Sequence, residues 1–125
     1  MTASEAPHLQ RGQNAENVAA AYLEGRGFRI HARNFRCAVG EIDLVAECGS
    51  ELHFIEVKGR WTQRAGGPLE QVTPRQMKRI GRAAQYYLQK QPDFGQKRLY
   101  FSVIGIDGRH EPVQIHWVPD AFELL

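Results

Sequence analysis

The spacing of apolar residues along the 125-residue chain predicts two helices and five strands. Apolar residues recur every three or four positions in residues 12–27, which indicates a helix that buries one face. A second helix is expected to begin at Thr73, because Thr73 can cap it, Pro74 suits the first helical position and Gln76 completes a capping box. Apolar runs predict strands at residues 28–36, 40–47, 52–60, 97–106 and 113–118.

The order of these elements predicts a single α/β domain in which a mixed central sheet is flanked by helices. Residues 1–11 show no periodicity and are expected to form a flexible tail, so the domain would span residues 12–125. In the first strand, Phe28, Ile30 and Ala32 are expected on one face. Residues 59–72 are expected to form a surface loop, and Asp120 to cap a short final turn.

The predicted hairpin of residues 40–60 carries charges that an ordinary hairpin would not. Asp43 interrupts its first apolar run, and Glu56 and Lys58 interrupt its second. Glu56 and Lys58 share a face of their strand, and Asp43 comes close to Glu56 if the register places both on that face. Burying such groups costs free energy unless they pair or bind a ligand. The three residues therefore form a candidate site, with a simple Glu56–Lys58 ion pair as the structural alternative.

The net charge of the chain is only +2, but positive charge is concentrated after the hairpin. Residues 59–98 contain nine Lys or Arg and only two acids. Four basic residues of the expected second helix share one face, apart from its apolar stripe, and with Arg60 they are candidates for binding the phosphates of a nucleic acid. The four are Arg75, Lys78, Arg79 and Arg82. A solvated helix face explains the basic segment alone equally well.

Composition sets the remaining limits. The two cysteines, Cys37 and Cys48, have no metal-binding or redox spacing, which favours a reducing compartment. No apolar run approaches the roughly 20 residues of a membrane helix, and the first ten residues do not resemble a signal peptide. We therefore expect a cytoplasmic protein that does not enter the membrane.

Several short motifs resemble known families. Asp43, followed after a turn by Glu56-Val57-Lys58, resembles the active-site pattern of the PD-(D/E)XK, restriction-endonuclease-like nucleases. A longer set of motifs is similar to the YraN-like family of uncharacterised bacterial proteins, which is related to archaeal Holliday-junction resolvases. These motifs are Ala15-Glu16, Asn34-Phe35-Arg36, residues 40–46, residues 54–58 and Val72-Thr73-Pro74-Arg75. The resemblance covers residues 12–122 and implies an αβββαβ core and an endonuclease acting on DNA, including branched or single-stranded DNA.

The oxygen ligands of this pattern suit Mg²⁺ or Mn²⁺ as the cofactor. Asp43 and Glu56, with the carbonyl of Val57, would hold the ion, which activates water for phosphodiester hydrolysis. Lys58 would orient that water or stabilise charge at phosphorus. By resemblance to the resolvases, Glu16 would reach in from the first helix as a further catalytic carboxylate.

Two residues depart from the family pattern. Gln76 stands where the second helix usually carries a lysine, and Ser102 stands where an aspartate is usual. Glu41 and Gln76 are candidates for supporting contacts around the site. Three functions stay open: a metal-dependent nuclease, a nucleic-acid binder without efficient catalysis, and an interaction module in DNA processing. Resolvase-like cutting of two strands would also require a homodimer.

Overall fold

The computed structural model describes residues 7–60 and 69–123 of the chain, with side chains from Asn14 onward. Its elements follow the order α, three β, α, two β, as predicted. They are α1 (Pro7–Gly25), β1 (Arg29–Cys37), β2 (Gly40–Cys48), β3 (Glu51–Arg60), α2 (Pro74–Lys90), β4 (Arg98–Asp107) and β5 (Gln114–Phe122), with short 3₁₀ helices η1 (Leu69–Gln71) and η2 (Pro92–Gln96). Residues 61–68 of the predicted loop lie outside the described residues.

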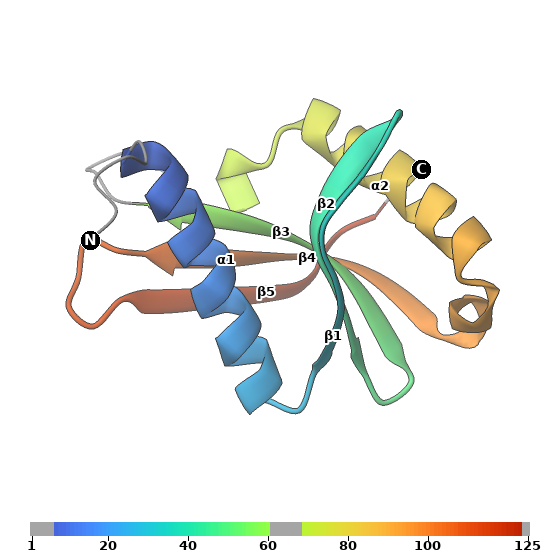
Figure 1. Cartoon of the computed structure of the whole chain (residues 1–125), viewed down its shortest axis with the longest axis horizontal. Helices are drawn as coiled ribbons and strands as arrows, with labels where there is room; N and C mark the ends of the chain where they lie inside the picture. Colours follow the sequence, from blue (N-terminus) through green and yellow to red (C-terminus); the bar gives the residue numbers. More distant parts are fainter. Residues whose placement is uncertain (1–6, 61–68, 124–125) are drawn as a thin grey trace.

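The five strands form one mixed sheet in the order β1-β2-β3-β4-β5. Strands β3 and β4 are parallel, and the other neighbouring pairs are antiparallel. A parallel pair needs a crossover connection, which here contains α2. Helices α1 and α2 lie on opposite faces of the sheet (Figure 1). The fold is therefore an α/β sheet flanked by helices, consistent with a restriction-endonuclease-like core.

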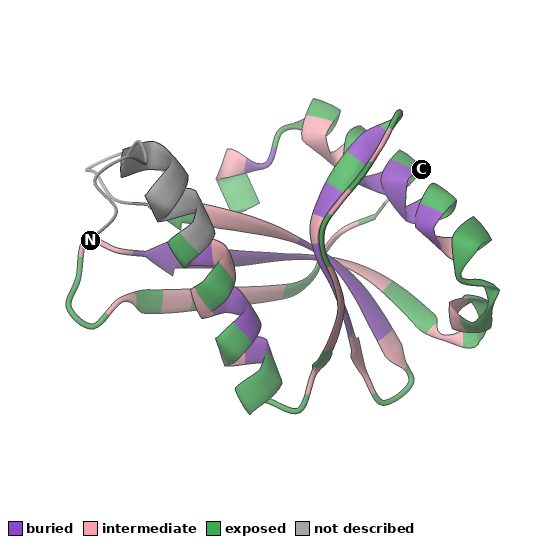
Figure 2. Cartoon of the chain, viewed as in Figure 1, coloured by how far each residue is buried: buried purple, intermediate pink, exposed green. Residues whose placement is uncertain are grey.

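Each face of the sheet has its own apolar core. On one face, Ala15, Ala19 and Leu23 of α1 pack with buried residues such as Leu44 and Ile104. On the other face, the buried side of α2 packs against β2 and β3 through Ile80, Ala84, Tyr87, Ile42 and Phe54. Figure 2 shows the buried residues concentrated on the central strands and on one side of α2. Burial of each large apolar side chain contributes roughly 1.5–3 kcal/mol, so the two cores fix the position of both helices.

The start of α1 differs from the expectation. The helix begins at Pro7 and not at Gly12, so residues 7–11 are helical where a tail was predicted, and residues 1–6 lie outside the described residues. Proline is favoured in the first turn because its missing N–H would have no helical partner there. The residues that follow it, including Leu9 and Gln10, have good helix propensity and favour extension of the helix.

The faces of β1 also differ from the expectation. The register of β1 against β2 shifts between Ile30 and Ala32. Ile30 packs in the core under α1, whereas Ala32 packs in the core under α2. An extra residue in one strand of an antiparallel pair disrupts the regular alternation of side chains. The prediction that Phe28, Ile30 and Ala32 share a face is therefore wrong for Ala32.

Residues 120–122 belong to a strand and not to the predicted turn, whose last residues, 124–125, lie outside the described residues. Strand β5 runs through Asp120 to Phe122, and Phe122 pairs with Phe101 beyond a register shift. Asp120 has a φ of 51° at this irregularity, and its N–H donates to Ser102 Oγ at 3.1 Å. The ring of Phe122 stacks on that of Phe101 with centroids 5.5 Å apart, so apolar packing extends the strand. No helix in the described part of the chain is long and apolar enough to cross a membrane.

Candidate metal site between two diverging strands

Strands β2 and β3 separate where the charged residues begin. Their ladder runs from Cys48–Glu51 to Leu44–Ile55 and stops there. Beyond that point β2 stays paired with β1, whereas β3 stays paired with β4. Figure 1 shows β2 leaving the direction of β3 and rising toward α2. Asp43 and Glu56 are the first residues past the last paired positions, so both lie at the mouth of this gap.

The start of β2 is held against α2 by a close backbone contact. A Cβ on Gly40 would lie 2.0 Å from the carbonyl oxygen of Arg79, so only glycine fits this approach. A capping box fixes the start of α2: Gln76 N–H donates to Thr73 Oγ1 at 3.2 Å, and Thr73 N–H donates to Gln76 Oε1 at 2.9 Å. The predicted start of α2 is thus confirmed. These two features set the distance between α2 and the gap.

The side chain of Asp43 takes the place of a backbone hydrogen-bond acceptor where β2 and β3 no longer pair. Its Oδ2 accepts a hydrogen bond from the Val57 N–H at 2.8 Å. Burial raises the pKa of Asp43 to about 6, while the Val57 N–H opposes this rise. The charges of Glu16 and Glu41 raise it further, and Lys58 lowers it. The N–H and C=O of one strand residue point to the same side, so the Val57 carbonyl also faces the gap.

Glu56 lies beside Asp43 with 14% of its side chain exposed. Burial raises its pKa to about 7, and the charge of Asp43 raises it as well. Lys58 acts in the opposite direction, with its Nζ 3.4 Å from Glu56 Oε1. Two neighbouring carboxyl groups whose pKa values are raised by burial bind a proton readily near neutral pH, or a cation in its place.

Glu16 and Glu41 each have a contact partner outside the Asp43–Glu56 pair. Glu16 Oε1 accepts a hydrogen bond from Asn34 Nδ2 at 2.8 Å, and the left-handed φ of 52° places Asn34 for this contact. Glu41 forms an exposed ion pair with Arg36 at 3.5 Å. Both acids act on the pKa of Asp43 through their charge. Of the acids predicted from the sequence, Glu56 lies beside Asp43, and Glu16 and Glu41 are near enough for their charges to raise the pKa of Asp43.

The donor set of the gap fits a hydrated divalent ion. The described residues contain no cluster of three or more His, Cys, Asp or Glu side chains that would hold a metal ion by itself. The gap offers two carboxylates and one backbone carbonyl. Mg²⁺ is commonly bound through one or two carboxylates while it keeps several of its waters, so oxygen donors of this number suit it.

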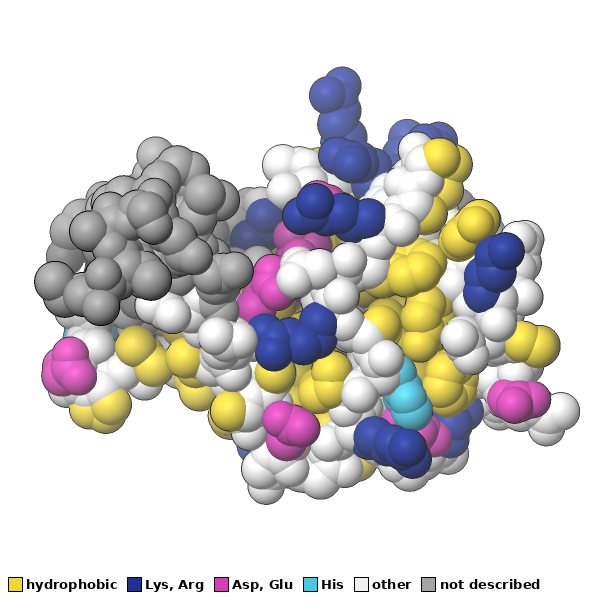
Figure 3. Space-filling model, viewed as in Figure 1, with side chains coloured by type: hydrophobic (Ala, Val, Ile, Leu, Met, Phe, Trp, Pro, Cys, Tyr) yellow, Lys and Arg dark blue, Asp and Glu magenta, His cyan; other side chains and the backbone are white. Residues whose placement is uncertain are grey.

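The predicted phosphate-binding residues border the same region. Arg75, Lys78, Arg79 and Arg82 are all exposed on α2 and line a shallow groove with Pro74. A small pocket lined by Glu41, Glu56, Gln76, Arg79 and Ile80 lies between this helix and the gap. In Figure 3, Lys and Arg side chains gather along the upper edge of the molecule with acidic side chains directly below them. Arg60 stands apart from the helix, at the end of β3.

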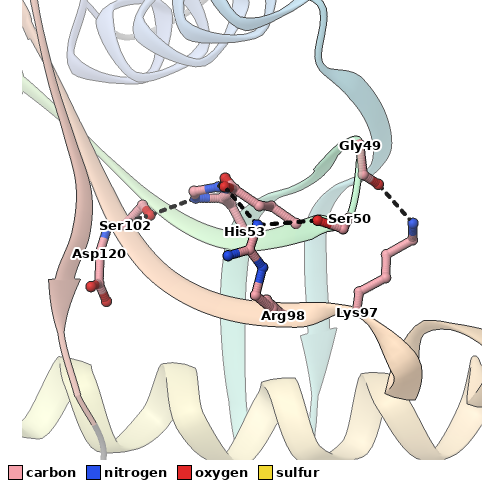
Figure 4. Close-up of polar contacts among 8 residues, drawn as sticks. Gly49, Ser50, His53, Lys97, Arg98, Ser102 and Asp120 are labelled. Atoms are coloured by element: carbon pink, nitrogen blue, oxygen red, sulfur yellow. Dashed lines mark hydrogen bonds and ion pairs between the residues drawn. The ribbon is translucent and has the colours of Figure 1, made fainter.

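A buried polar network that the sequence did not suggest crosses the sheet on β3, β4 and β5 (Figure 4). His53 is 2% exposed, its Nδ1 lies 2.8 Å from Ser102 Oγ, and its Nε2 lies 2.9 Å from Glu51 Oε1. A carboxylate only accepts, so Nε2 is the donor to Glu51, and Nδ1 shares a hydrogen bond with the Ser102 hydroxyl. Ser102 is fully buried, so its place is in the core. The sequence feature that could have indicated this network is the presence of the polar residues His53 and Ser102 within the apolar runs of β3 and β4.

Comparison with known proteins identifies relatives along nearly the whole chain. The model of uncharacterised protein family UPF0102 matches residues 15–106. A UPF0102 protein of Nitrosococcus oceani is 40% identical over 119 residues, covering 95% of this chain and 96% of the relative. A UPF0102 protein of Halorhodospira halophila is 44% identical over 113 residues, covering 90% and 87%. One of Shewanella loihica is 41% identical over 122 residues, covering 98% and 100%. The chain therefore belongs to the uncharacterised protein family UPF0102, the bacterial YraN-like family that its motifs resemble.

Proposed function

We propose that this protein is a metal-dependent nuclease that hydrolyses phosphodiester bonds in DNA. The observation that supports this most is the pairing of Asp43 and Glu56 in the gap between β2 and β3, where burial raises the pKa of both and the charge of Asp43 raises that of Glu56 further. Such a pair costs folding free energy unless a cation neutralises it. Groups whose pKa is shifted by burial and by a specific charged neighbour are concentrated at functional sites.

Each residue of the gap has a distinct task in this proposal. Asp43, Glu56 and the Val57 carbonyl hold Mg²⁺ or Mn²⁺, which supplies an activated water and neutralises negative charge at phosphorus. Asp43 is kept in place by the Val57 N–H. Lys58, whose Nζ lies 3.4 Å from Glu56, orients the attacking water or donates to the phosphate oxygens. Glu16 and Glu41 add negative charge behind Asp43 and strengthen its hold on a cation.

The DNA strand lies along α2 in this proposal. The exposed cations Arg75, Lys78, Arg79 and Arg82 neutralise its phosphates and release counterions. The pocket beneath Arg79 and Gln76 then connects the backbone of the strand with Glu56. Cutting both strands of a branched duplex symmetrically needs two copies, so action on such a substrate would require a homodimer. The two free cysteines, Cys37 and Cys48, fit a reducing cytoplasm as the place of action.

A second candidate is a nucleic-acid-binding protein with little or no catalysis. Gln76, which stands in place of the usual lysine, is fully used as the capping partner of Thr73. Ser102, in place of the usual aspartate, is buried and bonded to His53. Neither residue then contributes a charge to the gap, whereas the cations of α2 remain exposed.

A cleavage assay separates the two candidates. Purified protein is incubated with labelled single-stranded, duplex, flap and four-way-junction DNA in the presence of Mg²⁺, Mn²⁺ or EDTA. The nuclease proposal predicts metal-dependent products that Lys58→Ala and Glu56→Gln abolish. The matched control is Lys90→Ala, which removes the same charge from the far end of α2 and should cleave normally. Salt-sensitive binding of the same substrates without cleavage would establish the second candidate.

A further inference from the structure

A pocket beside the gap is lined mostly by residues that the proposed chemistry does not use. It has a volume of about 330 Å³, and Lys58 forms part of its wall. Its floor is made by two rows of residues across β3, β4 and β5. The first row is Lys58, Gly105 and His116, and the second is Arg60, Asp107 and Gln114. Side chains in such rows point to the same face of a sheet.

The middle residue of the first row is a glycine. Gly105 contributes no side chain between Lys58 and His116, so the floor is lowest there. The imidazole of His116 is exposed on β5, and the amides of Gln114 and Gln71 also line the pocket. An aromatic ring and two amides are the groups with which proteins stack on an unpaired base and bond to its edges. The volume is at the lower end of the roughly 300–1,000 Å³ of ligand pockets, so it suits one nucleotide better than a base pair.

The lining of the pocket has a net positive charge, because Lys58, Arg60 and Arg109 outnumber Asp107. Asp107 is 5% exposed and is neutralised by Arg109, whose Nη2 donates to Asp107 Oδ2 at 2.7 Å and whose Nε donates to Oδ1 at 2.9 Å. These hydrogen bonds hold the pKa of Asp107 well below its usual range. A ligand in the pocket would therefore meet the cations Lys58 and Arg60 beside the Arg109–Asp107 ion pair.

Arg60 has a buried hydrogen-bond donor, its Nε, that lacks an acceptor within the described part of the chain. A buried donor without a partner costs about 1–3 kcal/mol, which an acceptor supplied by a ligand would recover. The guanidinium group matches the geometry of phosphate oxygens, to which it donates two parallel hydrogen bonds.

We propose that this pocket binds one unpaired nucleotide of a DNA strand, with its phosphate on Arg60 and its base against His116. The proposal rests on the proposed function for the choice of DNA as the ligand. Arg60 lies two residues beyond Lys58, a rise of about 6.6 Å along the strand, so the bound nucleotide neighbours the bond to be cut. The preferred substrates are therefore single-stranded or branched DNA, in which a nucleotide next to the cut is unpaired.

Binding is tested without cleavage. The full chain in EDTA is titrated with dTMP, inorganic phosphate and thymidine, and backbone amide shifts are followed by NMR. The proposal predicts saturable binding of dTMP, tighter than that of phosphate or thymidine, with shifts at Gly105 and His116. Arg60→Gln should weaken dTMP binding by about tenfold or more. His116→Ala, on the exposed face of β5, should weaken dTMP binding but leave phosphate binding unchanged.

The control is Arg98→Gln, which removes an exposed arginine from the opposite end of β4 and should bind dTMP normally. Binding of dTMP no tighter than phosphate, or binding unaffected by Arg60→Gln and His116→Ala, would overturn the proposal. Glu56→Gln distinguishes this failure from that of the proposed function, because it should lose cleavage and still bind dTMP. Normal dTMP binding by a wild-type protein that never cleaves DNA would leave the pocket established and the nuclease proposal refuted.

Discussion

The Asp43 carboxylate accepts the Val57 N–H at 2.8 Å, just past the point where β2 and β3 cease to pair. In a continued ladder this N–H would bond to a backbone carbonyl of β2. Here a side chain takes that place, which lets the strands diverge without leaving a buried donor unsatisfied. The divergence and the acidic gap are thus parts of one arrangement.

The stability of the metal-free protein should fall as the pH rises from 5 to 8. The ordinary pKa values of Asp43 and Glu56 are 3.8 and 4.5, and the folded state raises them to about 6 and about 7. The folded state therefore binds protons more tightly than the unfolded state, so the stabilisation is fully present below the ordinary values and is lost through pH 6–7. The expected loss is on the order of 2 kcal/mol.

Urea unfolding in EDTA at several pH values measures this effect. Asp43→Asn should flatten the profile between pH 5 and 8, because it removes one of the two repelling charges. Glu41→Gln is the control, since Glu41 is exposed and contributes less to the pKa of Asp43 than burial does. A wild-type profile that rises over this range would contradict the assignment of a repelling pair.

Gly40→Ala should destabilise the protein by about 2 kcal/mol or more, because the new Cβ would lie 2.0 Å from the Arg79 carbonyl oxygen. Relief of that clash would move β2 away from α2 and widen the pocket that contains Glu56. Thermal unfolding measures the loss. Gly25→Ala serves as the control, because a Cβ there meets nothing within 4 Å. Equal stability of the two variants would show that β2 does not depend on the close contact.

Ser102→Ala should cost about 1–3 kcal/mol, because it removes the partner of the buried His53 Nδ1 and of the partly buried Asp120 N–H. Denaturant unfolding checks this value. Ser50→Ala is the control, since Ser50 is exposed and its Oγ accepts a hydrogen bond from Arg98 at the surface. Any binding or cleavage of DNA should survive in Ser102→Ala at a temperature where it is folded. Loss of function in folded protein would place Ser102 in the site.

Replacement of Arg75 or Lys78 by Gln should weaken DNA binding by the same factor whatever the base sequence of the DNA, because phosphate contacts do not depend on the bases. Each phosphate contact removed from duplex DNA should lower the slope of log affinity against log salt concentration by about 0.9. Fluorescence anisotropy at four or five salt concentrations gives the slope. Lys90→Gln, at the end of α2, should leave it unchanged. An unchanged slope in Arg75→Gln and Lys78→Gln would refute α2 as the contact surface.

The parts of the fold that depend on local sequence were predictable. The start of α2 was found because Thr73, Pro74 and Gln76 interact within one turn. The hairpin of β2 and β3 was found because its turn residues interrupt two apolar runs. The acidic cluster was found because charges in apolar strands are costly and therefore informative.

The parts that depend on contacts between distant segments were not predictable. The shift between Ile30 and Ala32 leaves no trace in the period of apolar residues, yet it moves Ala32 to the other core. The reason for Gly40 became visible only with Arg79 beside it. The pocket of Arg60 and His116 is assembled by the register of three strands, which one sequence does not reveal.

The central claim is that the gap between β2 and β3 binds a divalent ion, and titration of the protein with Mn²⁺ by isothermal calorimetry tests it most directly. We predict one ion per chain, with an affinity that rises from pH 6 to pH 8 as the carboxyls of Asp43 and Glu56 lose their protons. The double variant Asp43→Asn, Glu56→Gln should not bind, whereas Glu41→Gln should. Absence of binding to the wild type, or equal binding to the double variant, would contradict the account.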